Sequence, residues 1–250
     1  MKKLLALLLV AFLAINFVAC SDDDDDGPTG PSTYKISGTI TDADGNGVGN
    51  LTVEAKSADD TKTTTTDSQG NYEFANLTAG ATYTITADGA NYYFKTAGTG
   101  EVTLNEDVTV NFTAVGIYGT WISEGANVAP LLFSLFGTAR IEATFNSNGS
   151  YEVVQTDTSG ASLTLSGTFT MTKSSVDNIF EITVDQTSPA ALTSIGIFEI
   201  YSDSSPFTMK YEIVQTSPDI GATPPTPAAG FGSTNGGLLG TSNVQTYVRQ

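Results

Sequence analysis

The sequence predicts an all-β protein with two folded units, an N-terminal β-sandwich followed by a C-terminal antiparallel β-barrel. Apolar and polar residues alternate with period two in many short segments of the 250-residue chain, which is the pattern of half-buried strands. Gly, Asn and Asp separate these segments, as they do in tight turns between antiparallel strands. The second half contains about eight such segments, which suits a closed meander barrel.

The composition excludes several kinds of chemistry. The chain has no His and a single Cys, Cys20, so it cannot form a Ser-His-Asp relay, a Cys-His protease site, a zinc site built from Cys and His, or an internal disulfide. Only acidic residues remain for catalysis, and no spacing identifies a carboxylate pair. The formal net charge of −17 repels nucleic acid. We therefore predict a non-enzymatic chain with no cofactor, no metal and no nucleic-acid partner.

The first residues have the pattern of a secretion signal. Two lysines precede the apolar run Leu4–Ala19, and we assign residues 1–19 to a signal peptide. An uncleaved membrane anchor is the alternative, although the run is shorter than the ~20 residues that a spanning helix needs.

The end of this run resembles the lipobox of bacterial lipoproteins. Val18-Ala19-Cys20 carries the resemblance, while Phe17 stands where that family usually has Leu. The resemblance implies that Cys20 receives fatty acyl groups such as palmitate, becomes the new N-terminus and anchors the chain to a membrane. Several acyl chains, at ~0.8 kcal/mol for each buried methylene, make such an attachment durable.

An acidic run follows the cysteine and belongs to a tether that we assign to residues 20–33. It resembles the export signal of surface lipoproteins of some Gram-negative bacteria, which implies an outer-membrane protein displayed on the cell surface. The alternative is a solvated tether that carries no export signal, in which case the protein could face the periplasm instead. The candidate export residues are Ser21, Asp22, Asp23, Asp24, Asp25 and Asp26.

Residues 34–115 form the first predicted unit. Its alternating segments are Tyr34–Thr41, Leu51–Ala55, Tyr72–Phe74, Tyr83–Ala87 and Val108–Phe112. The segments SGTITDADGNGVGNLTV (Ser37–Val53) and TDSQGNYEFANLTAG (Thr66–Gly80) resemble the carboxypeptidase regulatory-like domain. This resemblance implies a transthyretin-like, Ig-like β-sandwich, and we expect it to act as a spacer between the membrane and the second unit.

One turn of this unit resembles half of a calcium site. Asp42–Gly47, DADGNG, fits the first half of an EF-hand loop, but Val53 stands where a bidentate Glu is required. Asp and Asn also suit a hairpin turn. We expect the turn and no calcium.

Residues 117–250 form the second unit. The triplet Gly119-x-Trp121, the hairpin Ala143–Val153 and the closing segment Thr246–Gln250 resemble lipocalin-like domains of bacterial lipoproteins. The resemblance implies that Trp121 closes one end of the barrel and that Arg249 lies over its indole. A guanidinium in that position contributes ~0.5 to 2 kcal/mol.

The inward positions of this barrel are candidates for binding a small hydrophobic ligand. Side chains of the same kind also fill small barrels completely, and the sequence does not separate these alternatives. The candidate ligand-lining residues are Phe145, Val153, Leu165, Phe169, Ile182, Met209 and Tyr211.

Two connections of the barrel stand out. Asn127–Gly137, NVAPLLFSLFG, has Pro early and Gly at its end, which predicts one or two helical turns that act as either a plug or a lid. Its candidate lid residues are Leu131, Leu132, Leu135 and Phe136. Ser217–Asn243 is too rich in Pro and Gly for a strand, and it either shapes the barrel mouth or is tolerated at the surface.

These observations favour a monomeric, lipid-anchored surface protein whose barrel binds a small apolar ligand. The alternative is a structural or adhesive component that binds protein or glycan through exposed strand edges. A free terminal donor strand would indicate that alternative, whereas Val244–Arg249 is predicted to be the closing barrel strand.

Overall fold

The computed structural model describes residues 33–96, 100–176, 178–203 and 205–250. The predicted signal peptide, Cys20 and the acidic run lie outside the described residues. Thr33–Gln250 forms one compact unit, and both hydrophobic cores lie entirely within it. Among the described residues, no helix has the length and apolar character needed to span a membrane.

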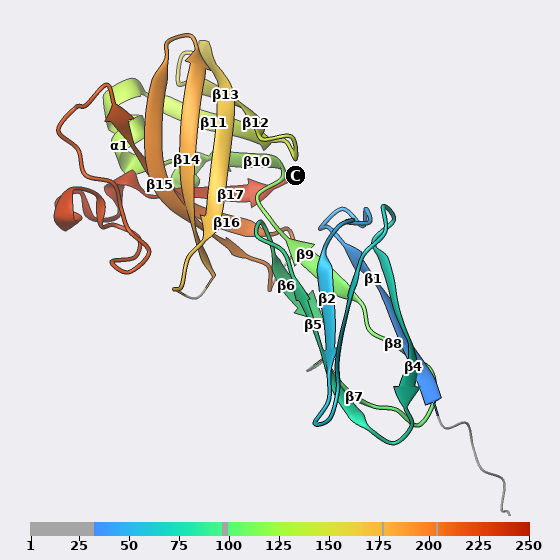
Figure 1. The fold of residues 1–250 in the computed structure, drawn as a ribbon. Coiled ribbons are helices and arrows are strands. Elements are labelled where there is room, and N and C mark those ends of the chain that lie inside the picture. The colour runs from blue at the N-terminus through green and yellow to red at the C-terminus, as the bar shows by residue number, and fades with distance from the viewer. Residues whose placement is uncertain (1–32, 97–99, 177, 204) are drawn as a thin grey trace, which may run out of the picture. The chain divides into compact units, whose positions relative to one another are not determined.

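The N-terminal part is a sandwich of two sheets (Figure 1). One sheet has the order β4-β1-β9-β6, with β8 also paired to β1, and the other has the order β3-β2-β5-β7. The strands are β1 (Thr33–Thr41), β2 (Thr52–Lys56), β3 (Thr61–Thr65), β4 (Asn71–Thr78), β5 (Thr82–Asp88), β6 (Tyr93–Thr96), β7 (Glu101–Thr103), β8 (Val108–Thr109) and β9 (Phe112–Val115).

Period-two alternation explains the sandwich core. Ile36 and Ile40 of β1 and Val53 of β2 are fully buried, and polar neighbours along each strand face the other way. The sandwich is not purely antiparallel, because β1 runs parallel to β8 and β9. The sequence pattern also missed β3, since its run of threonines has no apolar side to reveal it.

The turn after β1 is held by its own side chains. Asp42 Oδ1 accepts hydrogen bonds from the backbone N–H groups of Asp44 and Asn46, and Asn46 Nδ2 donates to Asp42 Oδ2. Asp67 makes the same three bonds with Gln69 and Asn71, and those from Asn71 are the main cause of its lowered pKa. The DADGNG segment is therefore a side-chain-capped turn.

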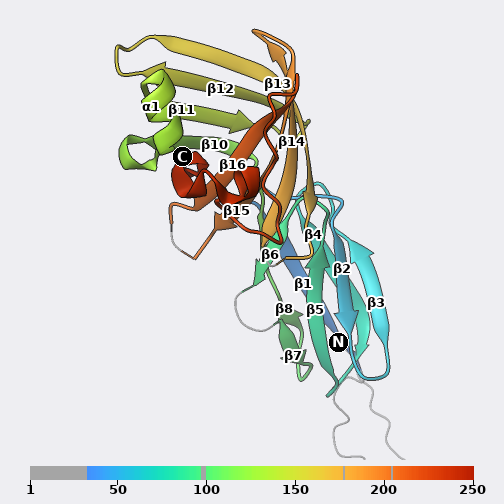
Figure 2. The ribbon, with the colours of Figure 1, turned by 90° about the vertical axis from the view of Figure 1, so that its left-hand side faces the viewer.

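The C-terminal part is a closed barrel of eight antiparallel strands, which confirms the predicted fold class (Figures 1 and 2). Each strand pairs with the next, and the first pairs with the last. The strands are β10 (Gly119–Glu124), β11 (Thr138–Phe145), β12 (Ser150–Asp157), β13 (Ser162–Lys173), β14 (Ile179–Ser188), β15 (Leu192–Tyr201), β16 (Thr208–Ser217) and β17 (Gln245–Arg249).

Short helices fill two of the barrel's connections. The α-helix α1 (Pro130–Phe136) follows the 3₁₀ turn η1 (Gly125–Asn127) and lies against β11 (Figure 2). Pro stands in its first turn, and Gly137 ends it with φ of 63°, so the predicted helix is confirmed. The connection between β16 and β17 contains the 3₁₀ turns η2 (Thr234–Gly237) and η3 (Gly240–Asn243) and no strand, as expected.

Candidate functional site

Trp121 and Arg249, the residues predicted to close one end of the barrel, lie next to each other in the structure. The two residues face each other across the β10–β17 pair, and the guanidinium carbon of Arg249 lies 5.6 Å from the centroid of the indole. The indole is fully buried, and its Nε1 donates to the carbonyl of Ile117 over 2.6 Å. This is the distance range in which a cation and an aromatic face attract each other.

The structure explains the Gly of the Gly-x-Trp triplet. Gly119 has φ of 114°, and a Cβ built there would lie 2.8 Å from Nη2 of Arg249. Any side chain at this position would therefore collide with the guanidinium as well as strain the backbone. The three residues therefore pack together as one group.

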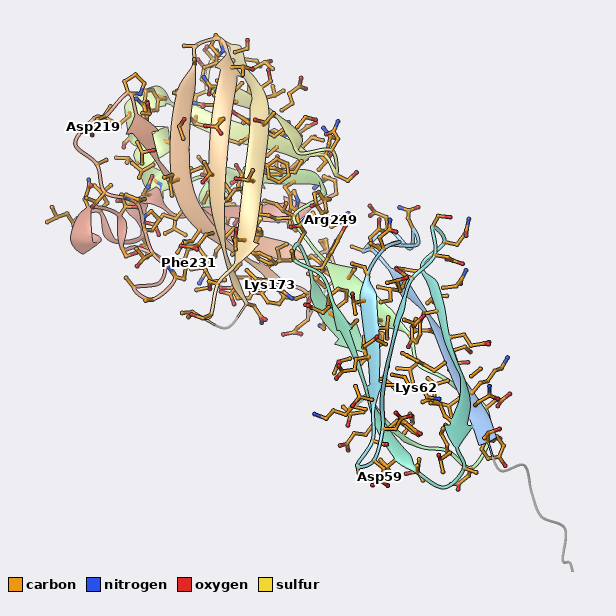
Figure 3. The ribbon with its side chains drawn as sticks, viewed as in Figure 1. Asp59, Lys62, Lys173, Asp219, Phe231 and Arg249 are labelled. Atoms are coloured by element: carbon orange, nitrogen blue, oxygen red, sulfur yellow. The ribbon has the colours of Figure 1, made fainter. Side chains whose placement is uncertain are left out.

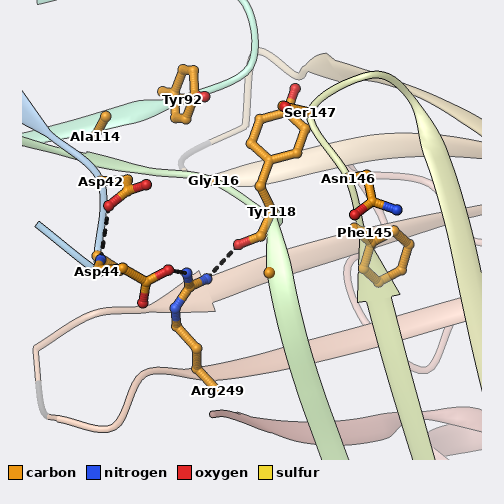
Figure 4. Close-up of a pocket in the computed structure, with 12 residues that line it drawn as sticks. Asp42, Asp44, Tyr92, Ala114, Gly116, Tyr118, Phe145, Asn146, Ser147 and Arg249 are labelled. Atoms are coloured by element: carbon orange, nitrogen blue, oxygen red, sulfur yellow. Dashed lines mark hydrogen bonds and ion pairs between the residues drawn. The ribbon is translucent and has the colours of Figure 1, made fainter. Parts of the chain in front are cut away.

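Arg249 is held by more than the indole. Its guanidinium donates to the carbonyl of Tyr118 and forms a 2.7 Å ion pair with Asp44, the turn residue after β1 (Figure 4). Arg249 is only 9% exposed, and within the described part of the chain its Nε has no hydrogen-bond partner. A hollow of about 260 Å³ lies beside it and is bounded by polar and aromatic groups such as Tyr92 and Asn146.

The interior of the barrel is divided between a packed part and a cavity. Phe180 and Phe198 stack with their centroids 4.8 Å apart, and Met209 is fully buried in the same core cluster. Elsewhere in the barrel, a cavity of about 210 Å³ remains. The barrel is therefore neither uniformly hollow nor uniformly filled.

Apolar side chains supply most of the cavity wall. Of the seven predicted lining residues, Phe145, Val153, Leu165 and Tyr211 lie on it. Phe169, Ile182 and Met209 do not line it and belong to the packed core instead. Alternation predicts which side chains point into the barrel. It does not predict which of them pack against each other and which border the cavity, because that depends on the side chains that meet from other strands.

The cavity also has polar lining residues that are not among the predicted ones: Tyr151, Tyr247, Gln155, Gln186 and Ser194. Tyr151 lies two residues before Val153, which was predicted to face inward, and Tyr247 lies two residues before Arg249, so the period-two pattern places each tyrosine on the same face as that neighbour. No charged side chain lies among the residues that line the cavity.

The tyrosines of the cavity are neutral at neutral pH, and burial moves their pKa values still further above it. Desolvation raises the pKa of Tyr211 well above its usual value, and the nearby Tyr247 and Tyr151 raise it further. Burial also raises the pKa of Tyr247, and it is the main cause that raises the pKa of Tyr151 to about 12. These phenols therefore remain hydrogen-bond donors at neutral pH.

Helix α1 contributes one residue to the cavity. Of the four candidate lid residues, Leu132 lines the cavity and packs on the barrel core. Leu131 is half-buried, and Leu135 and Phe136 are 64% and 61% exposed. Phe133, which was not among the predicted residues, is also exposed.

The Pro- and Gly-rich connection packs on the outer wall of the barrel through a buried carboxylate. Glu212 stands between Tyr211 and Ile213, which line the cavity, so alternation places it on the outer, solvent-facing side of β16, yet it is fully buried. It accepts hydrogen bonds from Gly232 N–H at 2.6 Å, from Thr234 N–H at 3.1 Å and from the Thr234 hydroxyl at 2.5 Å. In the same connection, which also carries Asp219, the ring of Phe231 lies 5.8 Å from Lys210 Nζ (Figure 3).

Comparison with known proteins identifies the first unit. Residues 35–115 match the family model of the carboxypeptidase regulatory-like domain. Chitinase ChiA of Flavobacterium johnsoniae is 36% identical over 81 residues, which is 32% of this chain and 5% of the chitinase. The chain thus consists of a carboxypeptidase regulatory-like domain followed by an eight-stranded antiparallel β-barrel.

Solved structures give weaker likenesses. The Bacillus anthracis TIE protein has a TM-score of 0.34 at 16% identity, covering 62% of this chain and 28% of that one. The shaft pilin SpaA of Lactobacillus rhamnosus GG has a TM-score of 0.30 at 14% identity, covering 65% and 92%. Likeness at this level carries no argument about fold or function.

Proposed function

We propose that the barrel binds a small, mainly apolar ligand, and that the chain holds this barrel at the cell surface through a lipid on Cys20. The observation that carries the proposal is the cavity of about 210 Å³ with its mainly apolar and aromatic wall. Binding sites for small molecules combine such a wall with a few polar groups. A cavity of roughly 150 Å³ in another protein takes benzene, so this one is large enough for a ligand of about one ring.

The lipocalin resemblance is consistent with this proposal. In that fold, a Gly-x-Trp triplet and an Arg on the last strand close the end of the barrel opposite the ligand. Here Gly119, Trp121 and Arg249 make the corresponding contacts, and none of the three lines the cavity. The regulatory-like domain would act as the spacer between the membrane and the barrel.

A structural or adhesive role is the alternative. It would need a terminal strand free to pair with another chain. β17 instead pairs with β10 on one side and β16 on the other, so the described barrel strands include no free terminal donor. The sandwich keeps its sheet edges and is the part of the chain on which this alternative would depend.

The test is a titration of the compact unit Thr33–Gln250 with cumene, a one-ring hydrocarbon, followed by NMR. We expect saturable shifts from one site. Leu165→Phe places extra volume in the cavity and should abolish them. Leu163→Phe is the matched control, since Leu163 lies two residues earlier on β13, is 48% exposed and does not line the cavity. Absence of saturable shifts in the parent chain with cumene and also with acetophenone, a one-ring ketone, or equal binding by Leu165→Phe, would contradict the proposal.

A further inference from the structure

Three tyrosine hydroxyls of the cavity have no hydrogen-bond partner among the described residues. Tyr151, Tyr211 and Tyr247 line it and are 5%, 9% and 5% exposed. Within the described part of the chain, none of these hydroxyls makes a hydrogen bond, and none is sealed from a water-sized probe. The three unpaired hydroxyls thus belong to residues that line the cavity.

The rings that carry these hydroxyls form one aromatic cluster with Phe145. The rings of Tyr211 and Tyr247 meet edge to face with centroids 6.0 Å apart, and the ring of Phe145 lies 6.4 Å from that of Tyr211 and from that of Tyr151. A buried phenol without a partner costs free energy, which an apolar ligand alone would not recover. The cluster is a set of donors that an oxygen-bearing ligand would satisfy.

Two glutamines place acceptors at the same wall. Gln155 Nε2 donates to the Thr138 hydroxyl at 2.6 Å, and Gln186 Nε2 donates to the Ala190 carbonyl at 2.8 Å. Each of these bonds uses one N–H of the amide and leaves its carbonyl oxygen able to accept a bond. The cavity therefore offers both donors and acceptors.

Charge excludes one class of ligand. None of the lining residues is Lys, Arg, Asp or Glu. A carboxylate or an ammonium group would thus enter the cavity without a counter-ion, which is strongly unfavourable in an apolar environment. Hydrogen bonds from neutral phenols suit an uncharged oxygen instead.

We propose that the ligand of this barrel is an uncharged compound of about one ring that carries a carbonyl, ether or hydroxyl oxygen, and that Tyr151, Tyr211 and Tyr247 bind this oxygen. The inference rests on the proposed ligand-binding function and specifies its ligand class. The oxygen would lie at the tyrosine cluster, and the apolar body would pack on side chains such as Val153, Leu165 and Ile213.

The experiment compares three probes of nearly the same size and shape, acetophenone, cumene and benzoate, by NMR titration of Thr33–Gln250. Acetophenone carries a carbonyl, cumene replaces it with a hydrocarbon branch, and benzoate carries a charge. Tyr211→Phe should weaken acetophenone binding about 3- to 10-fold, the value of one net hydrogen bond. The same variant should leave cumene binding unchanged or tighter, because it removes a hydroxyl that cumene leaves unpaired. Benzoate should not bind.

Tyr201→Phe is the matched control. Tyr201 does not line the cavity, and its hydroxyl donates to Glu199 instead, so this change should alter neither affinity. The remaining phenols can take over the role of Tyr211 in the single variant. The triple variant Tyr151→Phe, Tyr211→Phe, Tyr247→Phe must then bind acetophenone more weakly and cumene equally or more tightly.

The outcomes separate the two proposals. If acetophenone and cumene bind but the triple variant changes both affinities alike, the tyrosine cluster does not select the ligand and this inference is wrong, while the proposed function stands. Benzoate binding as tight as that of acetophenone would also overturn the inference. If neither neutral probe binds, the proposed function fails as well.

Discussion

Removing one acceptor from Glu212 should detach the Pro- and Gly-rich connection from the barrel wall. The carboxylate is buried on the outer side of β16 and accepts three hydrogen bonds from Gly232 and Thr234. Glu212→Gln keeps the size and shape of the side chain. It replaces one of the two oxygens with an NH₂ group, so one of the facing N–H donors loses its acceptor.

The expected magnitude follows from these bonds. A hydrogen bond to a charged acceptor contributes ~1.5 to 3 kcal/mol, and a buried donor without a partner costs ~1 to 3 kcal/mol. If the Oε1 position stays an oxygen, Thr234 keeps its two bonds and Gly232 loses its single bond. We therefore expect the attachment of the connection to weaken by ~1.5 to 3 kcal/mol, which is roughly a 10- to 100-fold loss of protection from hydrogen exchange.

Hydrogen exchange measured by mass spectrometry on peptides from residues 228–243 tests this expectation. Glu181→Gln is the matched control, since Glu181 is an exposed residue of β14. The strands of the barrel should keep their protection in both variants, because the connection opens locally while the interior core stays packed. Unchanged exchange in the connection of Glu212→Gln would refute the reasoning and show that the connection is held by other contacts.

The other predictions concern the barrel closure and the anchor. Arg249→Ala removes the contact with Trp121 and the hydrogen bond to Tyr118. Thermal unfolding should therefore show that the free energy of unfolding falls by ~1 to 3 kcal/mol, and Arg249→Lys should restore only part of it. An unchanged melting temperature of Arg249→Ala would contradict this prediction. Cys20→Ser should abolish acyl labelling and membrane retention, and retention of both would exclude the lipid anchor. Replacing Asp22–Asp26 with Ala should keep the labelling but reduce protease accessibility on intact cells, whereas equal accessibility would leave the run as a tether.

The barrel was predictable because its alternation has a direct physical cause. A strand with one face in the core and one in water must alternate, and Phe207–Ile213 does so over most of its length. We predicted a closed barrel because the second half of the chain contains about eight such strands. The strands β3, β6 and β7 of the sandwich were missed because each is too short to show a clear alternation, so their pairing with neighbouring strands decides their conformation.

The candidate site was only partly predictable, because it depends on contacts between segments that are far apart in the sequence. Glu212 alternates as a wet residue, and only the return of Gly232 and Thr234 to its side makes it buried. Likewise, Asp44 has the pattern of a turn residue, and its ion pair with Arg249 spans most of the chain. The lining tyrosines lie at inward positions that alternation predicts. That their hydroxyls make no hydrogen bond within the described chain can be seen only from the packing of the whole interior.

The distribution of charge explains why an acidic protein with an uncharged cavity would favour neutral ligands. The chain carries a formal net charge of −17, so anions are repelled before they reach the barrel. An anion that did reach it would find no cation among the cavity residues, since the buried Arg249 is committed to Tyr118, Asp44 and the indole. Long-range repulsion and the cost of an unpaired buried charge thus act in the same direction, although only the second depends on the cavity. Because salt screens the first effect and leaves the second in place, benzoate should remain excluded at high ionic strength.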